Sequence, residues 1–238
     1  MLLGAVRDEF VDRSWDPPGR HWTGSASRLL GGRDRAAGGT WLAVDPGPDR
    51  PAVAALVNGP PFPLLPPPPS GVRPTRGTLA LTLLTTDTRP TAESLAGYDR
   101  FHLLLATLEG AEVWSWDGDH LDYRRITPGD HILVNHGLDA DADPLVPHFF
   151  PLLTQAPTPD PRPGLPAATA WGRWLDLLAG DGLDPIDPRA LVMRRVFAGR
   201  AYGSTSACLV ALSPSGVRYD FTADPRRPSS WYEVDTGS

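Results

Sequence analysis

The chain has 238 residues, of which 41% are apolar, and a formal net charge of −6 at pH 7. This length suits one large domain, expected over residues 1–238. No apolar run reaches the roughly 18 residues that a membrane helix needs, and no hydrophobic leader is expected. The acidic balance argues against a nucleic-acid surface. We expect a cytoplasmic protein with no membrane span and no nucleic-acid partner.

All 22 basic residues are Arg, because the sequence contains no Lys. P-loop, Schiff-base and pyridoxal-phosphate enzymes each depend on a lysine amine, so none of these classes is expected. The single cysteine, Cys208, excludes a disulfide framework and a cysteine-based zinc cluster. Cys208 lies in the apolar run Ala207–Leu212, which favours a buried, inert thiol over a reactive one.

The first predicted element is a short buried strand over Leu2–Val6, and Arg7, Asp8 and Glu9 follow it directly. The runs Thr40–Val44 and Ala52–Val57 predict an antiparallel hairpin.

Gly77–Leu84 fits helix or strand by periodicity and is predicted as a helix, and Thr91–Leu95 resembles the start of a short helix. The runs Phe101–Ala106, Glu112–Trp116 and Leu121–Arg125 alternate with turn residues and predict a three-stranded meander.

Further strands are predicted over Gly129–Asn135, Ser206–Leu212 and Val217–Thr222. One face of an amphipathic helix is predicted from apolar residues at helical spacing, namely Trp171, Trp174, Leu175 and Leu178. This pattern favours an α+β domain of two antiparallel sheets with segregated helices.

The sequence lacks the residues that several common metal, catalytic and nucleotide-binding motifs require. Asp139, Asp141 and Asp143 have the spacing of a calcium loop, but Pro144 occupies the glycine position. The histidines His131, His136 and His148 lack metal-ligand spacing. Neither a G-x-S-x-G elbow nor a dinucleotide fingerprint is present. No metal and no cofactor is therefore expected.

Polar residues at predicted strand ends are the remaining candidates for a site: Arg7, Asp8, Glu9, Asn58 and Asn135. If these ends meet at one rim, they offer a cation, two carboxylates and two amides that suit oxyanion binding and substrate orientation. In the alternative interpretation, Arg7 simply pairs with a neighbouring carboxylate, and the two asparagines only tolerate turn conformations.

Six short blocks of the chain form a recognisable series: Ala5–Phe10, Gly38–Val44, Ala54–Asn58, Arg76–Gly77, Ile132–Asn135 and Tyr202–Ser206. In this order they resemble the NRDE family, also called the transport and Golgi organisation protein 2 family. The resemblance implies an αββα sandwich of two antiparallel sheets flanked by helices, as in amino-terminal-nucleophile hydrolases. In those enzymes, a cysteine at the mature amino terminus attacks an amide and its own α-amine acts as the base.

By this resemblance, Arg7 and Asp8 orient the nucleophile, while Asn58 and Asn135 hold substrate and oxyanion. Glu9, Trp41 and Thr205 are the expected substrate-binding residues, although many members carry Arg at the position of Thr205.

Family members begin Met-Cys and complete a first strand before the Arg-Asp-Glu segment, so by this resemblance that strand is missing or truncated here. Without the cysteine the chain is expected to be inactive. Either a longer form supplies the cysteine, which we expect, or the chain is a degenerate form. Two functions follow from the resemblance. One is a cysteine-type hydrolase acting on a small amide or acyl substrate. The alternative is a non-catalytic protein that binds or traffics haem or an acyl lipid.

Overall fold

The computed structural model describes residues 1–61, 63–68, 71–86 and 88–237. In this part of the chain two compact units each contain an antiparallel sheet. The first unit comprises Met1–Ser14, Asp130–Ile132 and Asp141–Ser238, and the second comprises Trp15–Gly129 and Leu133–Ala140. The predicted α+β class with antiparallel sheets is confirmed, whereas a single domain over residues 1–238 stays a prediction.

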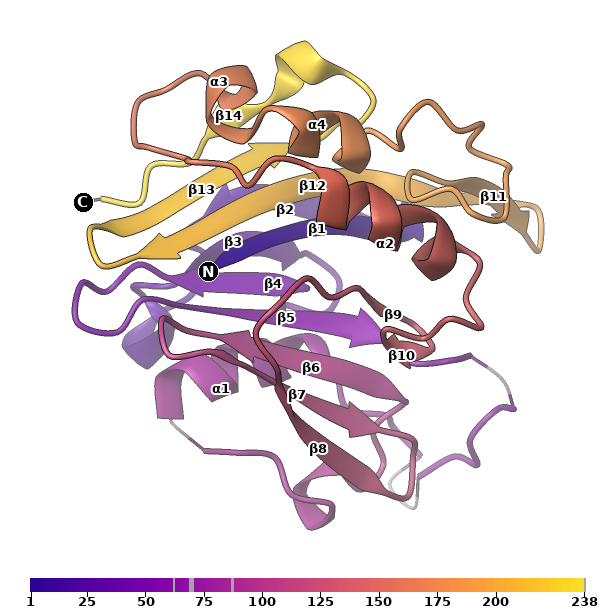
Figure 1. Ribbon diagram of the computed structural model, residues 1–238. Helices are drawn as coiled ribbons and strands as arrows, with labels where there is room; N and C mark the ends of the chain where they lie inside the picture. The colour runs from indigo at the N-terminus through magenta and orange to yellow at the C-terminus, as the bar shows by residue number, and fades with distance from the viewer. Residues whose placement is uncertain (62, 69–70, 87, 238) are drawn as a thin grey trace. The chain divides into compact units, whose positions relative to one another are not determined.

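The sheet of the first unit is built around one long strand, β12 (Arg200–Ser213) (Figure 1). Its antiparallel partners are β1 (Leu2–Phe10) and β13 (Gly216–Thr222), and β11 (Arg194–Phe197) pairs with its first residues. β14 (Tyr232–Glu233) extends the sheet beyond β13. The predicted strands over 206–212 and 217–222 are confirmed as one hairpin.

Helices of the first unit are α2 (Leu145–Gln155), α3 (Ala167–Trp171) and α4 (Arg173–Leu178). The predicted continuous helix through residues 171–178 is wrong, because Gly172 adopts φ 50° and ψ −125° and separates α3 from α4. The predicted face is nevertheless buried against β12, in a cluster that includes Trp171, Leu175, Leu178 and Leu209.

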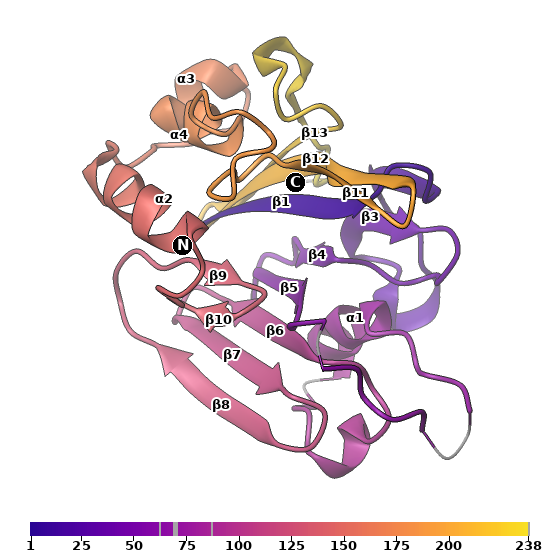
Figure 2. The ribbon, with the colours of Figure 1, turned by 90° about the vertical axis from the view of Figure 1, so that its right-hand side faces the viewer.

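The second unit is a meander in which consecutive strands are neighbours, as Figure 2 shows for β6, β7 and β8. Its strands are β2 (Trp15–Gly19), β3 (Leu30–Asp34), β4 (Leu42–Asp45), β5 (Ala52–Asn58), β6 (Phe101–Ala106), β7 (Ala111–Trp116) and β8 (Leu121–Ile126). The predicted hairpin and the predicted three-stranded meander are both confirmed. Short 3-10 turns lie at Gly24–Ala26, Glu93–Leu95 and, in the first unit, Pro228–Ser230.

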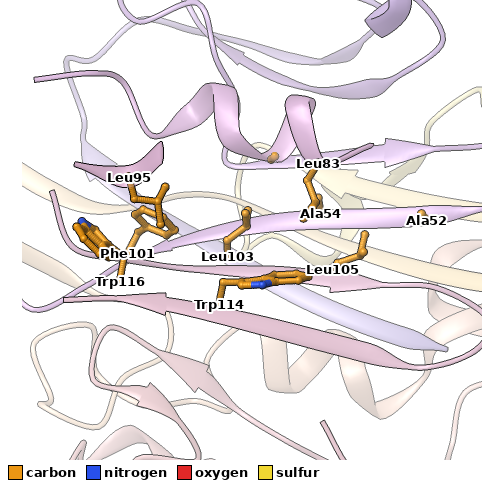
Figure 3. Packing of buried hydrophobic residues seen from close by; sticks show 10 residues of the cluster. Ala52, Ala54, Leu83, Leu95, Phe101, Leu103, Leu105, Trp114 and Trp116 are labelled. Carbon is orange, nitrogen blue, oxygen red and sulfur yellow. The ribbon is translucent and has the colours of Figure 1, made fainter. Parts of the chain in front are cut away.

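The core of the second unit lies between its sheet and α1 (Gly77–Thr86), which confirms the predicted helix. Leu83 of α1 and Leu95 reach down toward strand residues of β5, β6 and β7 (Figure 3). The strand residues on this face are Ala52, Ala54, Phe101, Leu103, Leu105, Trp114 and Trp116. Alternation within each strand therefore leaves the even-numbered residues of β6 on the opposite face.

Two sequence predictions about strand limits are wrong. β1 continues through Arg7, Asp8 and Glu9 to Phe10, because β12 is long enough to pair with all of these residues. The expected strand over residues 129–135 is instead a small hairpin of β9 (Leu133–Val134) and β10 (Gly137–Leu138). Gly137 has φ 118°, a conformation that suits glycine and ends the apolar run in a turn.

Gly39 lies where the backbone before β4 meets the start of α1. A Cβ at Gly39 would lie 2.5 Å from the carbonyl carbon of Gly77, and the Thr40 N–H donates to the Gly77 carbonyl at 3.0 Å. We expect Gly39→Ala to destabilise the protein by about 1–3 kcal/mol, because backbone must move. Urea unfolding measures this loss. Gly38→Asn is the control, since a Cβ at Gly38 meets nothing within 4 Å and Asn is the side chain that best tolerates its φ of 74°; an equal loss in both variants would contradict the steric explanation.

Candidate functional site

A β-bulge interrupts the pairing of β1 with β12 at the Arg-Asp-Glu segment. Arg7 pairs with Ser206, whereas Asp8 pairs with Ser204, so Thr205 is the extra residue of β12. Bulges locally disrupt a ladder and redirect side chains, and they are over-represented beside active sites. The polar residues that were expected at a strand end therefore lie within the sheet, and the bulge changes the direction of side chains beside them.

Asp8 is the carboxyl whose proton affinity changes most at the bulge. Burial raises the pKa of Asp8 from its ordinary value of 3.8 to about 6, against opposing effects from Ser204, Arg195 and Arg7. The Ser204 hydroxyl donates to Asp8 Oδ1 at 2.5 Å and accepts the Met193 N–H at 2.9 Å. This carboxyl is therefore held in place and titrates near neutral pH, as a general acid or base requires.

Arg7 is buried, with 8% of its surface exposed. Its Nη1 donates to Thr205 Oγ1 at 2.9 Å, and its Nη2 lies 3.8 Å from Glu9 Oε2. Arg13 Nε approaches the same Glu9 oxygen at 3.5 Å. Successive strand residues point to opposite faces, so Arg7 and Asp8 present their side chains on different faces of the sheet.

The single cysteine lies in the same sheet but not at the bulge. Cys208 is buried in β12, as expected from the sequence. Burial raises the pKa of its thiol to about 12. Since the thiolate is the nucleophilic form, Cys208 is inert at neutral pH.

The structure places four predicted site residues at the bulge in the first unit: Arg7 contacts Thr205 and Glu9, whereas the side chain of Asp8 lies on the other face and is bound by Ser204. The other three belong to the second unit. Asn58 is the last residue of β5, and Asn135 lies in the exposed turn between β9 and β10. Trp41 packs edge-on against Trp15, with ring centroids 5.8 Å apart.

Sequence reasoning missed a paired histidine and serine in the second unit. His102 of β6 and Ser115 of β7 are direct cross-strand partners, and His102 Nδ1 lies 2.8 Å from Ser115 Oγ. His102 Nε2 lies 3.1 Å from the carbonyl oxygen of Asn135. The four-residue loop Thr107–Gly110 could have given this register, because counting outward from its ends pairs Ala106 with Ala111 and His102 with Ser115.

A pocket of about 530 Å³ opens beside this pair. Its lining includes His102, Ser115, Trp116, Arg100, His120 and His136. The volume lies within the range of small-molecule sites, and the lining mixes an aromatic surface with convergent polar groups. Burial lowers the pKa of His102, so its imidazole is neutral at physiological pH.

In the described ranges, no group of three or more His, Cys, Asp or Glu side chains could hold a metal ion. The helices that the structure describes include none with the length and apolar character to cross a bilayer.

Antiparallel sheets with helices packed on them define an α+β protein, and the Arg-Asp-Glu segment lies at the bulge between β1 and β12. The sequence matches the model of the transport and Golgi organisation 2 family over residues 1–148. This match covers more than half of the chain, so the chain belongs to that family. Curated proteins gave no match to the sequence.

The bulge makes stability depend on pH through Asp8. A carboxyl whose native pKa lies near 6 stabilises the fold fully below about pH 4, and this contribution is lost as the pH rises through about 6. Asn cannot ionise but can still accept from Ser204. We therefore expect the difference in unfolding free energy between Asp8→Asn and wild type to shift in favour of the variant by about 2–3 kcal/mol as the pH rises from about 4 to about 7.5. Urea unfolding at both pH values tests this, and a pH-independent difference would contradict it.

Proposed function

We propose that the protein is a hydrolase acting on a small amide or acyl substrate, with Arg7 and Asp8 positioning the nucleophile. The observation that carries the proposal is the Asp8 carboxyl, held by Ser204 and with its pKa raised to about 6. Such a group can accept and return a proton near neutral pH. The buried guanidinium of Arg7 supplies a fixed positive charge on the same strand.

The nucleophile in this proposal is the cysteine at a mature amino terminus that the family resemblance implies. Cys208 does not fill this role, because burial keeps its thiol protonated. Glu9 and Thr205 contribute by holding Arg7 through its contacts at 3.8 Å and 2.9 Å. Asn58, Asn135 and Trp41 are proposed substrate contacts that rest on the resemblance.

The test uses protein made from its own gene locus. Its intact mass and its iodoacetamide-labelled thiols are determined, and hydrolysis of N-acyl p-nitroanilides of several chain lengths is followed. We expect Asp8→Asn to lower kcat/KM by about 100-fold or more. Asp12→Asn is the matched control, because Asp12 is exposed and pairs with Arg200 at the surface. Equal turnover in both variants, or no turnover and no labelled thiol, would contradict the proposal.

A second function, binding of haem or an acyl lipid without catalysis, is favoured by the pocket in the second unit. This pocket of about 530 Å³ is lined by three histidines, His102, His120 and His136, and by Arg100 and Trp116. Haemin and palmitoyl-CoA titrations, followed by the Soret band and by Trp fluorescence, test this function. His136→Ala is expected to weaken haemin binding, and the absence of saturable binding of either ligand would contradict it. A cytoplasmic location belongs to the same proposal, and cell fractionation tests it.

A further inference from the structure

Both ring nitrogens of His102 have a polar partner, the Ser115 hydroxyl on one side and the Asn135 carbonyl on the other. A neutral imidazole carries one proton, and a backbone carbonyl oxygen can only accept a hydrogen bond. The contact of 3.1 Å to the Asn135 carbonyl therefore places the proton on His102 Nε2. His102 Nδ1 is left as the acceptor for the Ser115 hydroxyl, 2.8 Å away.

These three groups have the roles of a nucleophile, a base and a group that orients the base. The Ser115 hydroxyl is aligned with an unprotonated nitrogen, and the Asn135 carbonyl fixes both the tautomer and the ring. Register reinforces this geometry, because His102 and Ser115 are cross-strand partners on adjacent strands of the seven-stranded sheet. A site on sheet strands is held more rigidly than one on loops.

The pair also lines a space that a substrate can enter. Both His102 and Ser115 line the pocket of about 530 Å³, together with Arg100 and His136. Arg100 brings a guanidinium to the pocket, which suits the oxyanion of a tetrahedral intermediate, whereas Asp117 and Asp122 also line the pocket and oppose an anionic group on the substrate.

We propose that Ser115 and His102 form a second catalytic site that hydrolyses small carboxylic esters by way of an acyl-serine. Ser115 Oγ attacks the ester carbonyl carbon while its proton passes to His102 Nδ1. The bond between the carbonyl carbon and the alkoxy oxygen then breaks, and the same proton passes to the departing alkoxide to give the alcohol. Water attacks the acyl-serine with His102 as base, which releases the carboxylic acid and restores the hydroxyl.

Esters fit this pair better than amides do. The orienting group is a neutral carbonyl, which stabilises the imidazolium less than a carboxylate would. An alkoxide leaves more readily than an amine anion and needs less help from a protonated base. The substrate class is therefore a short, uncharged ester, small enough for the pocket, that develops negative charge next to Arg100 in the tetrahedral intermediate.

The test treats the whole chain with a fluorophosphonate, which modifies activated serines, and locates the adduct by peptide mass spectrometry. We expect the adduct on Ser115 and its loss in Ser115→Ala. We also expect labelling to be about 100-fold slower in His102→Gln. Ser213→Ala is the matched control, because Ser213 lies in the other unit, hydrogen-bonded to Ser215 and to the Gly216 carbonyl, and its loss should leave labelling unchanged. A folded wild-type protein without an adduct on Ser115 would overturn the proposal.

A second variant separates catalysis from folding. In Ser115→Cys the new thiol should be alkylated by iodoacetamide much faster than Cys208, which is buried and has a pKa near 12. Adding His102→Gln to this variant should slow the alkylation. An unchanged rate would overturn the role of His102. Asp8→Asn should leave both labelling reactions intact, so failure here is distinguishable from failure of the proposed amide hydrolase.

Discussion

Asp220→Ala is expected to destabilise the protein by about 3–5 kcal/mol, because it leaves a buried guanidinium with only Glu233, 3.8 Å away, as a counter-charge. Arg218 and Asp220 are 2% and 0% exposed. Arg218 Nε lies 2.6 Å from Asp220 Oδ2, and Arg218 Nη2 lies 3.0 Å from Oδ1. Trp171 Nε1 donates to Asp220 Oδ2 at 2.8 Å, so the substitution also removes the acceptor of a buried indole.

Chemical denaturation with urea measures this loss. The control is Asp160→Ala, because Asp160 forms an ion pair with Arg162 in which both side chains are more than 70% exposed. Such surface pairs contribute about 0–1 kcal/mol. The double variant Arg218→Met with Asp220→Leu should recover much of the loss, since it removes both charges together. A loss for Asp220→Ala as small as that of the control would contradict this account of the first unit.

Phe101→Ala should cost about 3–5 kcal/mol by opening a cavity in the second unit. Phe101 is 0% exposed and lies among Leu95, Leu103 and Trp116 (Figure 3). Its ring also meets Tyr98 edge-on, with centroids 6.4 Å apart. The surrounding strands are fixed by the sheet and can collapse only partly into the space.

The shift in urea midpoint measures this effect. Phe150→Ala makes the same chemical change on α2, where the side chain is 36% exposed, and should cost less than half as much. Phe101→Leu should fall between the two, because it keeps most of the apolar volume. Equal losses for Phe101→Ala and Phe150→Ala would show that Phe101 is not part of the core.

The parts of the fold predicted correctly are those with strong local signals. The meander of β6, β7 and β8 follows from alternating apolar residues and turn dipeptides, and α1 from the run after Arg76. The short apolar run before Asn135 carried no such signal, and Gly137 turned it into a hairpin. β1 extends through Arg7 to Phe10 because pairing with β12 outweighs the polar composition of that segment.

The residues of the candidate site were chosen from the sequence and stay a prediction, and the geometry around them was not predicted. The bulge that carries Arg7, Asp8 and Thr205 depends on one extra residue in β12, which no local pattern indicates. The raised pKa of Asp8 depends on burial, which arises from tertiary packing. Single-residue patterns also gave no reason to join His102 with Ser115 before the register was known.

The most direct test of the account is the pKa of Asp8 itself, measured by carbon-13 NMR of its carboxyl during a pH titration of the whole chain. Asp8→Asn assigns the signal. We expect a midpoint of about 6, and a higher one in Ser204→Ala, because the Ser204 hydroxyl opposes the effect of burial. A midpoint near the ordinary value of 3.8 would contradict the claim that the bulge in β1 and β12 holds an acid–base group.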